Sequence, residues 1–329
     1  MINNSMSRRR FAGLAFGLAA AGSAAGCVQV PKPISATPPS RPTVDAADVP
    51  AILKHYEEAY AKAAKSYDLN ALAKLEAQPI AQGTLHHFGL NKKFKTTPDE
   101  VPTLVEPEVF STAAGDFPRR FFALSRAEAG DDDDYRVLTL HQRRSSTDAW
   151  QLVNRVWLPS DSVPDFVRDR DGLAEVVPND SKEFGTAPGD LPDLIAEAMQ
   201  NPKSKAGQQM AATDDWKRAQ KILAEDRRSG DPEGVNTTIS VRPKAEVTAF
   251  RTADGAAALV VVEYVTSWNA EDNWIVRYRK DSTAVKYYPG EYKSLINREQ
   301  RRMLVTQGAD EKVHIVGMTQ LTTGVEAVS

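Results

Sequence analysis

The sequence predicts an α+β protein of two modules, each a helix or helical hairpin packed on a curved antiparallel sheet. Apolar side chains first recur at helical spacing, and the pattern then changes to short β-branched or aromatic runs. The same order returns in the second half, after a stretch rich in Pro and Gly. We therefore expect a first module over 48–160, a linker over 161–188 and a second module over 189–329.

The first module is expected to open with a helix at Asp48, which can accept hydrogen bonds from the first turn, where Pro50 also fits. Apolar side chains then follow at helical spacing as far as Tyr67. Asp68 can cap a second short helix, which Pro79 is expected to end. Four strands are expected after it, over 104–111, 120–125, 135–142 and 149–158.

The second module is expected to contain helices over 193–199 and 213–230. Strands are expected over 239–242, 245–252, 256–268, 274–279 and 313–325. Asp254-Gly255 between two apolar runs indicates a hairpin. The apolar residues 259–262 predict a strand that is covered on both faces.

The N-terminal segment predicts export followed by lipidation. Three consecutive arginines precede an uncharged run from Phe11 to Ala25, and small residues lead into Cys27, the single cysteine of the chain. That run would rise about 22 Å as a helix, less than the roughly 30 Å hydrocarbon core. We expect a signal peptide over 1–26 and acyl chains such as palmitate on Cys27, holding the protein on the extracytoplasmic face of the cell membrane. Arg8 and Arg9 form a twin-arginine export signal, although the residues that follow leave both export routes open.

Residues 27–47 are rich in Pro, Ser and Thr and predict an extended tether that carries the folded part away from the bilayer. Removal of residues 1–26 takes away three arginines and no acids, which leaves 38 basic and 44 acidic residues and a net charge of −6. No cysteine other than Cys27 is present to form disulfides.

Motifs for catalysis and metal binding are weak. His86 and His87 are adjacent, and on a strand they would point to opposite faces, so they are not expected to share an ion. The acidic run 131–134 lacks the EF-hand spacing and suits a solvated hairpin tip. Nucleophile and phosphate-loop motifs are missing. We therefore predict no catalytic residue, no metal and no cofactor.

A segment that differs from the rest runs from Trp268 to Arg302. Eight basic and three acidic residues lie between Arg277 and Arg302, which gives a net charge of +5 inside an acidic protein, and aromatic residues are interleaved. Such a segment suits an anionic envelope polymer or anionic headgroups. In the alternative interpretation the rings are core and the bases form a solvated sheet face. The candidate binding residues are Trp268, Trp274, Tyr278, Arg298, Arg301 and Arg302.

The context of Cys27, the opening helix 52–58, the segment 72–79 and the hairpin 251–260 together resemble an uncharacterised family of actinobacterial surface lipoproteins. The order of helices and strands, repeated, also resembles tandem NTF2-like or cystatin-like modules. These resemblances imply a fold and a location, and they bring no functional residues.

Two classes of function follow. The first is a non-catalytic binding or scaffolding protein of the cell envelope, whose partners are the membrane, an anionic polymer or another envelope protein, and not nucleic acid. The alternative is a pocket protein for a small molecule or lipid, with isomerase or dehydratase chemistry inside an NTF2-like cone. The interior volume of each module distinguishes the two classes.

Overall fold

A computed structural model describes residues 40–98, 101–128, 134–228, 234–244, 247–280 and 282–329. The predicted signal peptide, Cys27 and the tether as far as Pro39 lie outside the described residues, as do three of the four acids in the run 131–134.

The first module has three helices and a four-stranded antiparallel sheet in the order β1-β2-β3-β4. The helices are α1 (Val49–Ser66), α2 (Leu69–Leu75) and α3 (Ile80–Phe94). The strands are β1 (Leu104–Ser111), β2 (Arg119–Ala127), β3 (Tyr135–Arg143) and β4 (Gln151–Pro159). Asp68 caps α2 as predicted, because its side chain accepts from the backbone N–H groups of Asn70 and Ala71 at 3.0 Å each.

Two details of the first module differ from the prediction. The Asp48 side chain makes no capping bond, and Asp45 instead caps a 3-10 turn, η1 (Ala46–Asp48), just before α1. Pro79 precedes a third helix that the sequence did not predict. His86 and His87 therefore lie on α3 and not on a strand.

The second module combines three helices with a six-stranded antiparallel sheet. The helices are α4 (Leu191–Gln200), α5 (Lys205–Gln209) and α6 (Asp214–Arg228). The strands are β5 (Val176–Val177), β6 (Val235–Pro243), β7 (Thr248–Thr252), β8 (Gly255–Ala270), β9 (Ser294–Gln307) and β10 (Val313–Val328). The order is β10-β9-β8-β7-β5, and β6 pairs with the second half of β8. Thr213 caps α6 by accepting from the backbone N–H of Trp216 at 3.2 Å.

Strand β9 is the main element that the sequence pattern missed, and the expected strand over 274–279 is wrong. Within that stretch only Val276 forms a bridge, to Tyr292, and the rest is a loop between β8 and β9. β9 contains Arg, Glu and Gln at positions that face inward, so its polar composition conceals a strand with neighbours on both sides.

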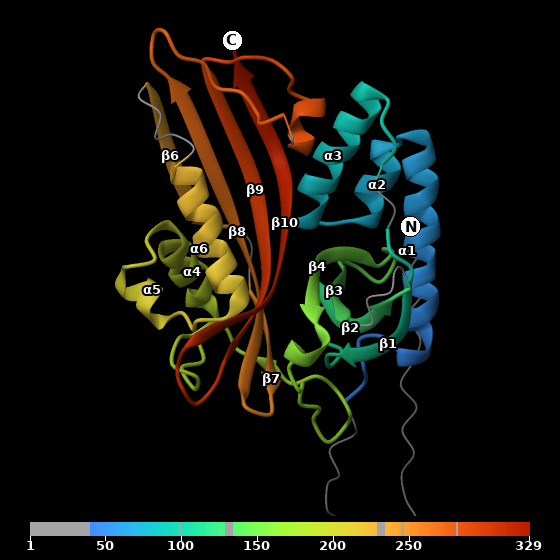
Figure 1. The fold of residues 1–329 in the computed structure, drawn as a ribbon. Helices are drawn as coiled ribbons and strands as arrows, with labels where there is room; N and C mark the ends of the chain where they lie inside the picture. The colour runs from blue at the N-terminus through green and yellow to red at the C-terminus, as the bar shows by residue number, and fades with distance from the viewer. Residues whose placement is uncertain (1–39, 99–100, 129–133, 229–233, 245–246, 281) are drawn as a thin grey trace, which may run out of the picture. The chain divides into compact units, whose positions relative to one another are not determined.

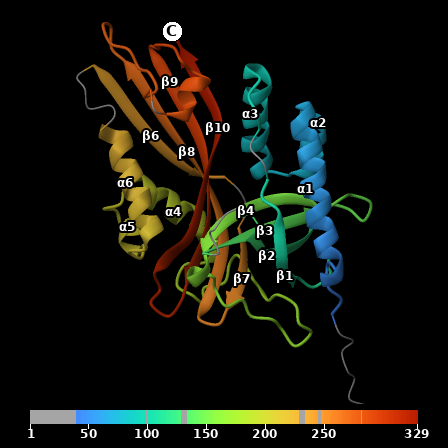
Figure 2. The same ribbon diagram turned by 45° about the vertical axis from the view of Figure 1, so that its right-hand side comes forward.

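The six-stranded sheet is covered on both faces, as the run 259–262 predicted. Leu259, Val260, Val261 and Val262 are at most 3% exposed. One face packs against α4 and α6, where Trp216 and Leu223 meet Val260 and Met303. The opposite face packs against the first sheet (Figures 1 and 2).

The hydrophobic core between the two sheets also contains part of the expected linker. Phe122 of β2 and Phe250 of β7 have ring centroids 4.2 Å apart, and Phe166 lies 4.8 Å from Phe122. Ala174 is buried beside them, and β5 joins the sheet through β7. The segment 161–188 therefore contributes to the core, and the division into two domains at this segment stays a prediction.

Two glycines permit close packing of the first module on β10. A Cβ at Gly317 would lie 2.6 Å from the Trp157 carbonyl oxygen and would also overlap the Leu158 side chain. A Cβ at Gly83 on α3 would overlap Leu321 of β10. The fold depends on the absence of side chains at both points.

Candidate functional site

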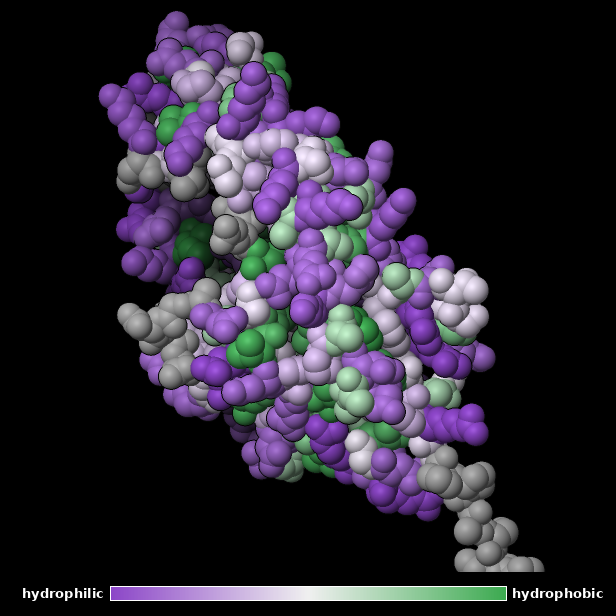
Figure 3. Space-filling view, turned by 90° about the vertical axis from the view of Figure 1, so that its right-hand side faces the viewer, coloured by the Kyte–Doolittle hydropathy of each residue, from purple (hydrophilic) through white to green (hydrophobic). Residues whose placement is uncertain are grey.

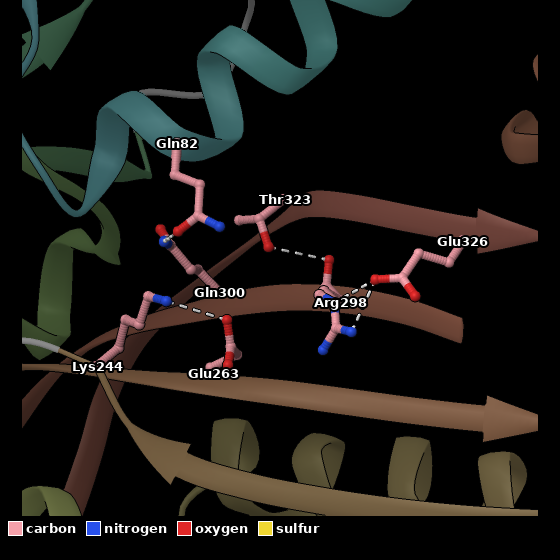
Figure 4. A network of polar contacts seen from close by, with 7 residues as sticks. All are labelled: Gln82, Lys244, Glu263, Arg298, Gln300, Thr323 and Glu326. Carbon is pink, nitrogen blue, oxygen red and sulfur yellow. Dashed lines mark hydrogen bonds and ion pairs between the residues drawn. The ribbon is translucent and has the colours of Figure 1, made fainter.

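The structure separates the six residues predicted to form one binding surface. Arg301 and Arg302 are 1% and 3% exposed, and they point to opposite faces of β9. Arg298 is half-buried and ion-paired with Glu326 of β10 at 2.8 Å (Figure 4). The charge of +5 over 277–302 therefore does not correspond to one exposed basic face, because three of its eight basic residues lie in β9, where they are buried or half-buried.

Arg301 lies on the helix-covered face of the sheet, in a cluster with acidic and aromatic groups. Its guanidinium stacks over the ring of Tyr264 at 3.5 Å and lies 3.8 Å from Glu299. The Tyr264 hydroxyl donates to Asp226 of α6 at 2.8 Å. Burial raises the pKa of Asp226 and of Glu299, and the positive charge of Arg301 opposes both shifts. This cluster joins α6 to β8 and β9.

Arg302 lies on the other face, in a polar cluster that joins the two modules and that the sequence did not reveal. The Tyr56 hydroxyl donates to Glu76 at 2.6 Å, and Glu76 is 2% exposed. Burial raises the pKa of Glu76. Burial, together with the nearby charge of Arg155, lowers the pKa of Arg302 to about 10. Glu76 carried no sequence signal, because its partners come from distant elements.

A hydrogen bond beside this cluster also joins the modules. The Gln300 side chain of β9 donates to Gln82 of α3 at 3.2 Å (Figure 4). Gln300 is fully buried. The polar side chains of residues 300–302 are therefore buried against neighbours on both faces of the sheet. Their polar character in the sequence does not indicate an exposed surface.

The first module is filled between α1 and its sheet, whereas a groove of about 560 Å³ lies beside α1, where Tyr60, Ala64 and Val101 line it. The cavity between α1 and the sheet, bordered by Tyr56, Leu152 and His141, measures about 10 Å³. That is about the least space that holds one water. His141 is 1% exposed and stacks on Phe121 with ring centroids 4.9 Å apart, and burial lowers its pKa to about 3. A second cavity of about 140 Å³ lies between the modules, beside Gln78, Arg120 and Asn154.

Trp274 and Tyr278 of the predicted surface lie together in the loop 271–293 between β8 and β9, and Trp268 lies half-buried on β8. The Lys293 ammonium donates to the carbonyl oxygens of Asp272 at 2.8 Å and Trp274 at 2.9 Å. Val276 and Tyr292 exchange two backbone hydrogen bonds, at 2.8 and 2.9 Å. The loop therefore has a defined conformation.

The far end of this loop is attached to α3. The Tyr287 hydroxyl donates to the side-chain oxygen of Asn91 at 3.0 Å, and the Tyr287 ring packs against Phe94 with centroids 5.4 Å apart. Tyr278 is half-buried, and burial raises the pKa of its hydroxyl. Binding by Trp268, Trp274 and Tyr278 stays a prediction.

Other kinds of site are not evident in the part of the chain that the structure describes. There, no three or more His, Cys, Asp or Glu side chains are grouped so that they could hold a metal ion. No helix within the described ranges is both long and apolar enough to cross a bilayer. The side of the first module that carries α1 is largely hydrophilic, with small separate apolar areas (Figure 3).

The two modules, each with helices packed on an antiparallel sheet, define an α+β protein. The family to which it belongs has no assigned activity. Residues 40–325 match the family model described as "Domain of unknown function (DUF8094)", and the chain belongs to this family. It is similar to the uncharacterized lipoprotein SCO2278 of Streptomyces coelicolor, with 25% identity over 301 residues and 86% of each chain covered. No solved structure matches the chain. These two matches confirm the resemblance to an uncharacterised family that includes a lipoprotein.

Proposed function

We propose that this protein is a lipid-anchored protein of the cell envelope that binds or scaffolds on the extracytoplasmic side and does not catalyse a reaction. The observation that carries the proposal is Cys27, the single cysteine, placed directly after Ala24-Ala25-Gly26 and an uncharged run. The similarity to a protein named as a lipoprotein supports it.

The same proposal includes the division of the chain. Residues 1–26 are the signal peptide, residues 27–47 the tether, and 48–160 and 189–329 the two modules on either side of 161–188. The tether contains five prolines after Cys27 and few large apolar residues, a composition that favours an extended chain.

Binding is favoured over catalysis in a cone because the described part of the first module has no substrate-sized space between α1 and its sheet, where His141 lies, and the groove of about 560 Å³ beside α1 is lined by neither His141 nor Glu76. A drug-sized ligand occupies pockets of roughly 300–1,000 Å³. The cavity under α1 measures about 10 Å³. The buried His141 and Glu76 are surrounded by packed side chains, so a ligand would have to displace the core to reach them.

Cys27→Ala tests the anchoring step. The wild-type chain, expressed in Streptomyces coelicolor, should be found in the membrane fraction, and mass spectrometry should detect a new N-terminus at an acylated Cys27. Cys27→Ala should lose the acyl mass and the membrane association. Ser35→Ala, a matched change within the tether, should behave as the wild type. An intact leader with a free thiol on the wild-type protein would contradict the proposal.

Arg8 and Arg9 decide the export route within this proposal. Replacing both by Lys keeps the positive charge but removes the twin arginine. We expect precursor to accumulate in the cytoplasm, as measured by immunoblotting of fractions. Arg10→Lys is the control with the same chemistry and should export normally. Normal export of the double variant would assign the chain to the general secretory route.

A further inference from the structure

We propose that the start of the loop 271–293 is a stacking site for an acidic glycan of the cell envelope, with Trp274 as its platform. The proposal rests on the extracytoplasmic location proposed above and names the binding surface and the class of its partner. It is carried by the fixed position of one indole ring, by the apolar residues beside it and by the cations that follow it.

The Trp274 ring is held against the backbone on one side. It contacts Gly234 so closely that a Cβ on Gly234 would overlap the ring, and Gly234 has a φ of +91° that suits glycine. The backbone N–H of Glu271 donates to the Gly234 carbonyl at 2.8 Å, which fixes the loop to the start of β6. Trp274 is nevertheless 43% exposed. A ring that is held against backbone at its Cδ1 and Nε1 atoms and is 43% exposed can act as a platform for a flat partner.

Lys293 sets the loop backbone beneath the platform. Its ammonium donates to the carbonyl oxygens of Asp272 and Trp274 at 2.8 and 2.9 Å, and a third carbonyl, of Glu271, lies at 3.5 Å. Three contacts from one ammonium to carbonyls within residues 271–274 reduce the conformational freedom that this segment would otherwise lose on binding. The platform is therefore pre-organised.

Exposed apolar residues gather at this end of the sheet. Six large apolar side chains are exposed among the described residues, and three of them, Trp274, Ile275 and Val328, belong to segments bonded to Lys293. Such gathering marks an interaction site more than scattered exposed residues do. A pyranose ring has an apolar C–H face that can lie on an indole, with hydroxyl groups at its edge that remain in water.

The cations that follow the platform in the chain favour an acidic sugar. Residues 276–288 contain four basic residues and one acid, a net charge of +3, whereas Glu271 and Asp272 precede Trp274 and the whole loop 271–293 has a net charge of +1. Arg277 is largely exposed and is only loosely paired with Glu291 at 3.7 Å, and Lys280 is exposed. Carboxylate or phosphate groups on a glycan can therefore meet cations while one of its sugar rings lies on Trp274.

The position of the site within the described part favours a polymer over the lipids of the anchoring membrane. Ser40, where the described chain begins, donates to Asp171 at 2.9 Å, and the neighbouring Phe166 forms a bridge to Thr252 at the β7–β8 turn. Trp274 follows the other end of β8, a strand of 16 residues that spans about 50 Å. The tether thus joins the fold at the end remote from the platform.

Sedimentation tests the proposal with the full-length lipidated protein in detergent. The probes are insoluble cell wall of Streptomyces coelicolor, the same wall after acid extraction of its anionic polymers, and chitin as a neutral glycan. We expect binding to the untreated wall that weakens with salt, and at least tenfold weaker binding to the other two. Trp274→Ala should weaken wall binding at least tenfold. Tyr135→Ala, at a tyrosine of equal exposure (42%) elsewhere, should not change it.

Two further measurements keep the outcome decisive. Lys293→Met keeps Trp274 but removes the contacts to the loop carbonyls, and it should also weaken wall binding. The melting temperature of Trp274→Ala should stay at the wild-type value. Equal binding by wild type and Trp274→Ala would overturn the proposal, as would binding to phosphatidylglycerol vesicles without binding to wall. Cys27→Ala should bind wall as the wild type does, so failure of lipidation and failure of the platform are separately visible.

Discussion

Phe250→Ala tests whether the two modules share one core. Phe250 is 1% exposed, and its ring centroid lies 4.2 Å from that of Phe122 in the first module and 6.4 Å from that of Phe166. Removing a fully buried ring costs about 3–5 kcal/mol, because transfer energy is lost and a cavity remains. For about 290 folded residues this corresponds to a fall of about 5–8 °C in melting temperature.

Differential scanning calorimetry measures the melting temperature, and hydrogen exchange shows which segments lose protection. Because Phe250 touches side chains of both modules, we expect faster exchange in α1 of the first module as well as in α6 of the second. Phe117→Ala, at an exposed phenylalanine, should cost less than about 1 kcal/mol. A loss of protection confined to the second module would refute the shared core.

Two other predictions follow from buried groups. Because His141 stays neutral in the fold down to a pKa of about 3 while the unfolded chain gains a proton near pH 6.5, stability should fall by up to about 1.4 kcal/mol per unit as pH drops through that window. In urea unfolding, the free energy of unfolding of His141→Gln should lack this dependence on pH. The control His314→Gln, at a half-exposed histidine, should keep it, and equal slopes of unfolding free energy against pH for the two variants would contradict the assignment to His141. Gly317→Ala should destabilise by about 1–3 kcal/mol through overlap with β4, whereas Gly324→Ala on the same strand, where the nearest atom is 3.8 Å away, should be nearly neutral in the same assay. Similar costs for both alanines would show that the close approach at Gly317 does not limit packing.

The fold class and most elements could be predicted because local signals agreed with the tertiary structure. The caps at Asp68 and Thr213 and the apolar run 259–262 each have the role expected from the sequence. Helix α3 was missed because it contains Gly83, Gly89 and two histidines, which weaken helical propensity. Gly83 is required there by the close approach to Leu321, a contact that no local pattern reveals.

The candidate site was only partly predictable, for a related reason. A run of bases predicts a solvated surface when each base is assumed to be exposed. In β9 the assumption is wrong, because both faces of the strand are covered and the consecutive side chains of residues 300–305 are all buried. Trp274 could be selected from the sequence, but its contact with Gly234 depends on two segments 40 residues apart that meet only in the folded protein.

The two arginines that looked like a binding surface instead explain how β9 joins the molecule. Arg301 stacks on Tyr264, whose hydroxyl donates to Asp226 of α6, and the charge of Arg302 lies close enough to Glu76 for each to shift the pKa of the other. A buried charge that loses its counter-charge is costly, so each arginine disfavours arrangements in which its partner element moves away. The orientation of both neighbours is thus coupled to one strand, and the loop that carries Trp274 ends directly before that strand. Fixing β9 from both sides therefore also fixes the base of the platform.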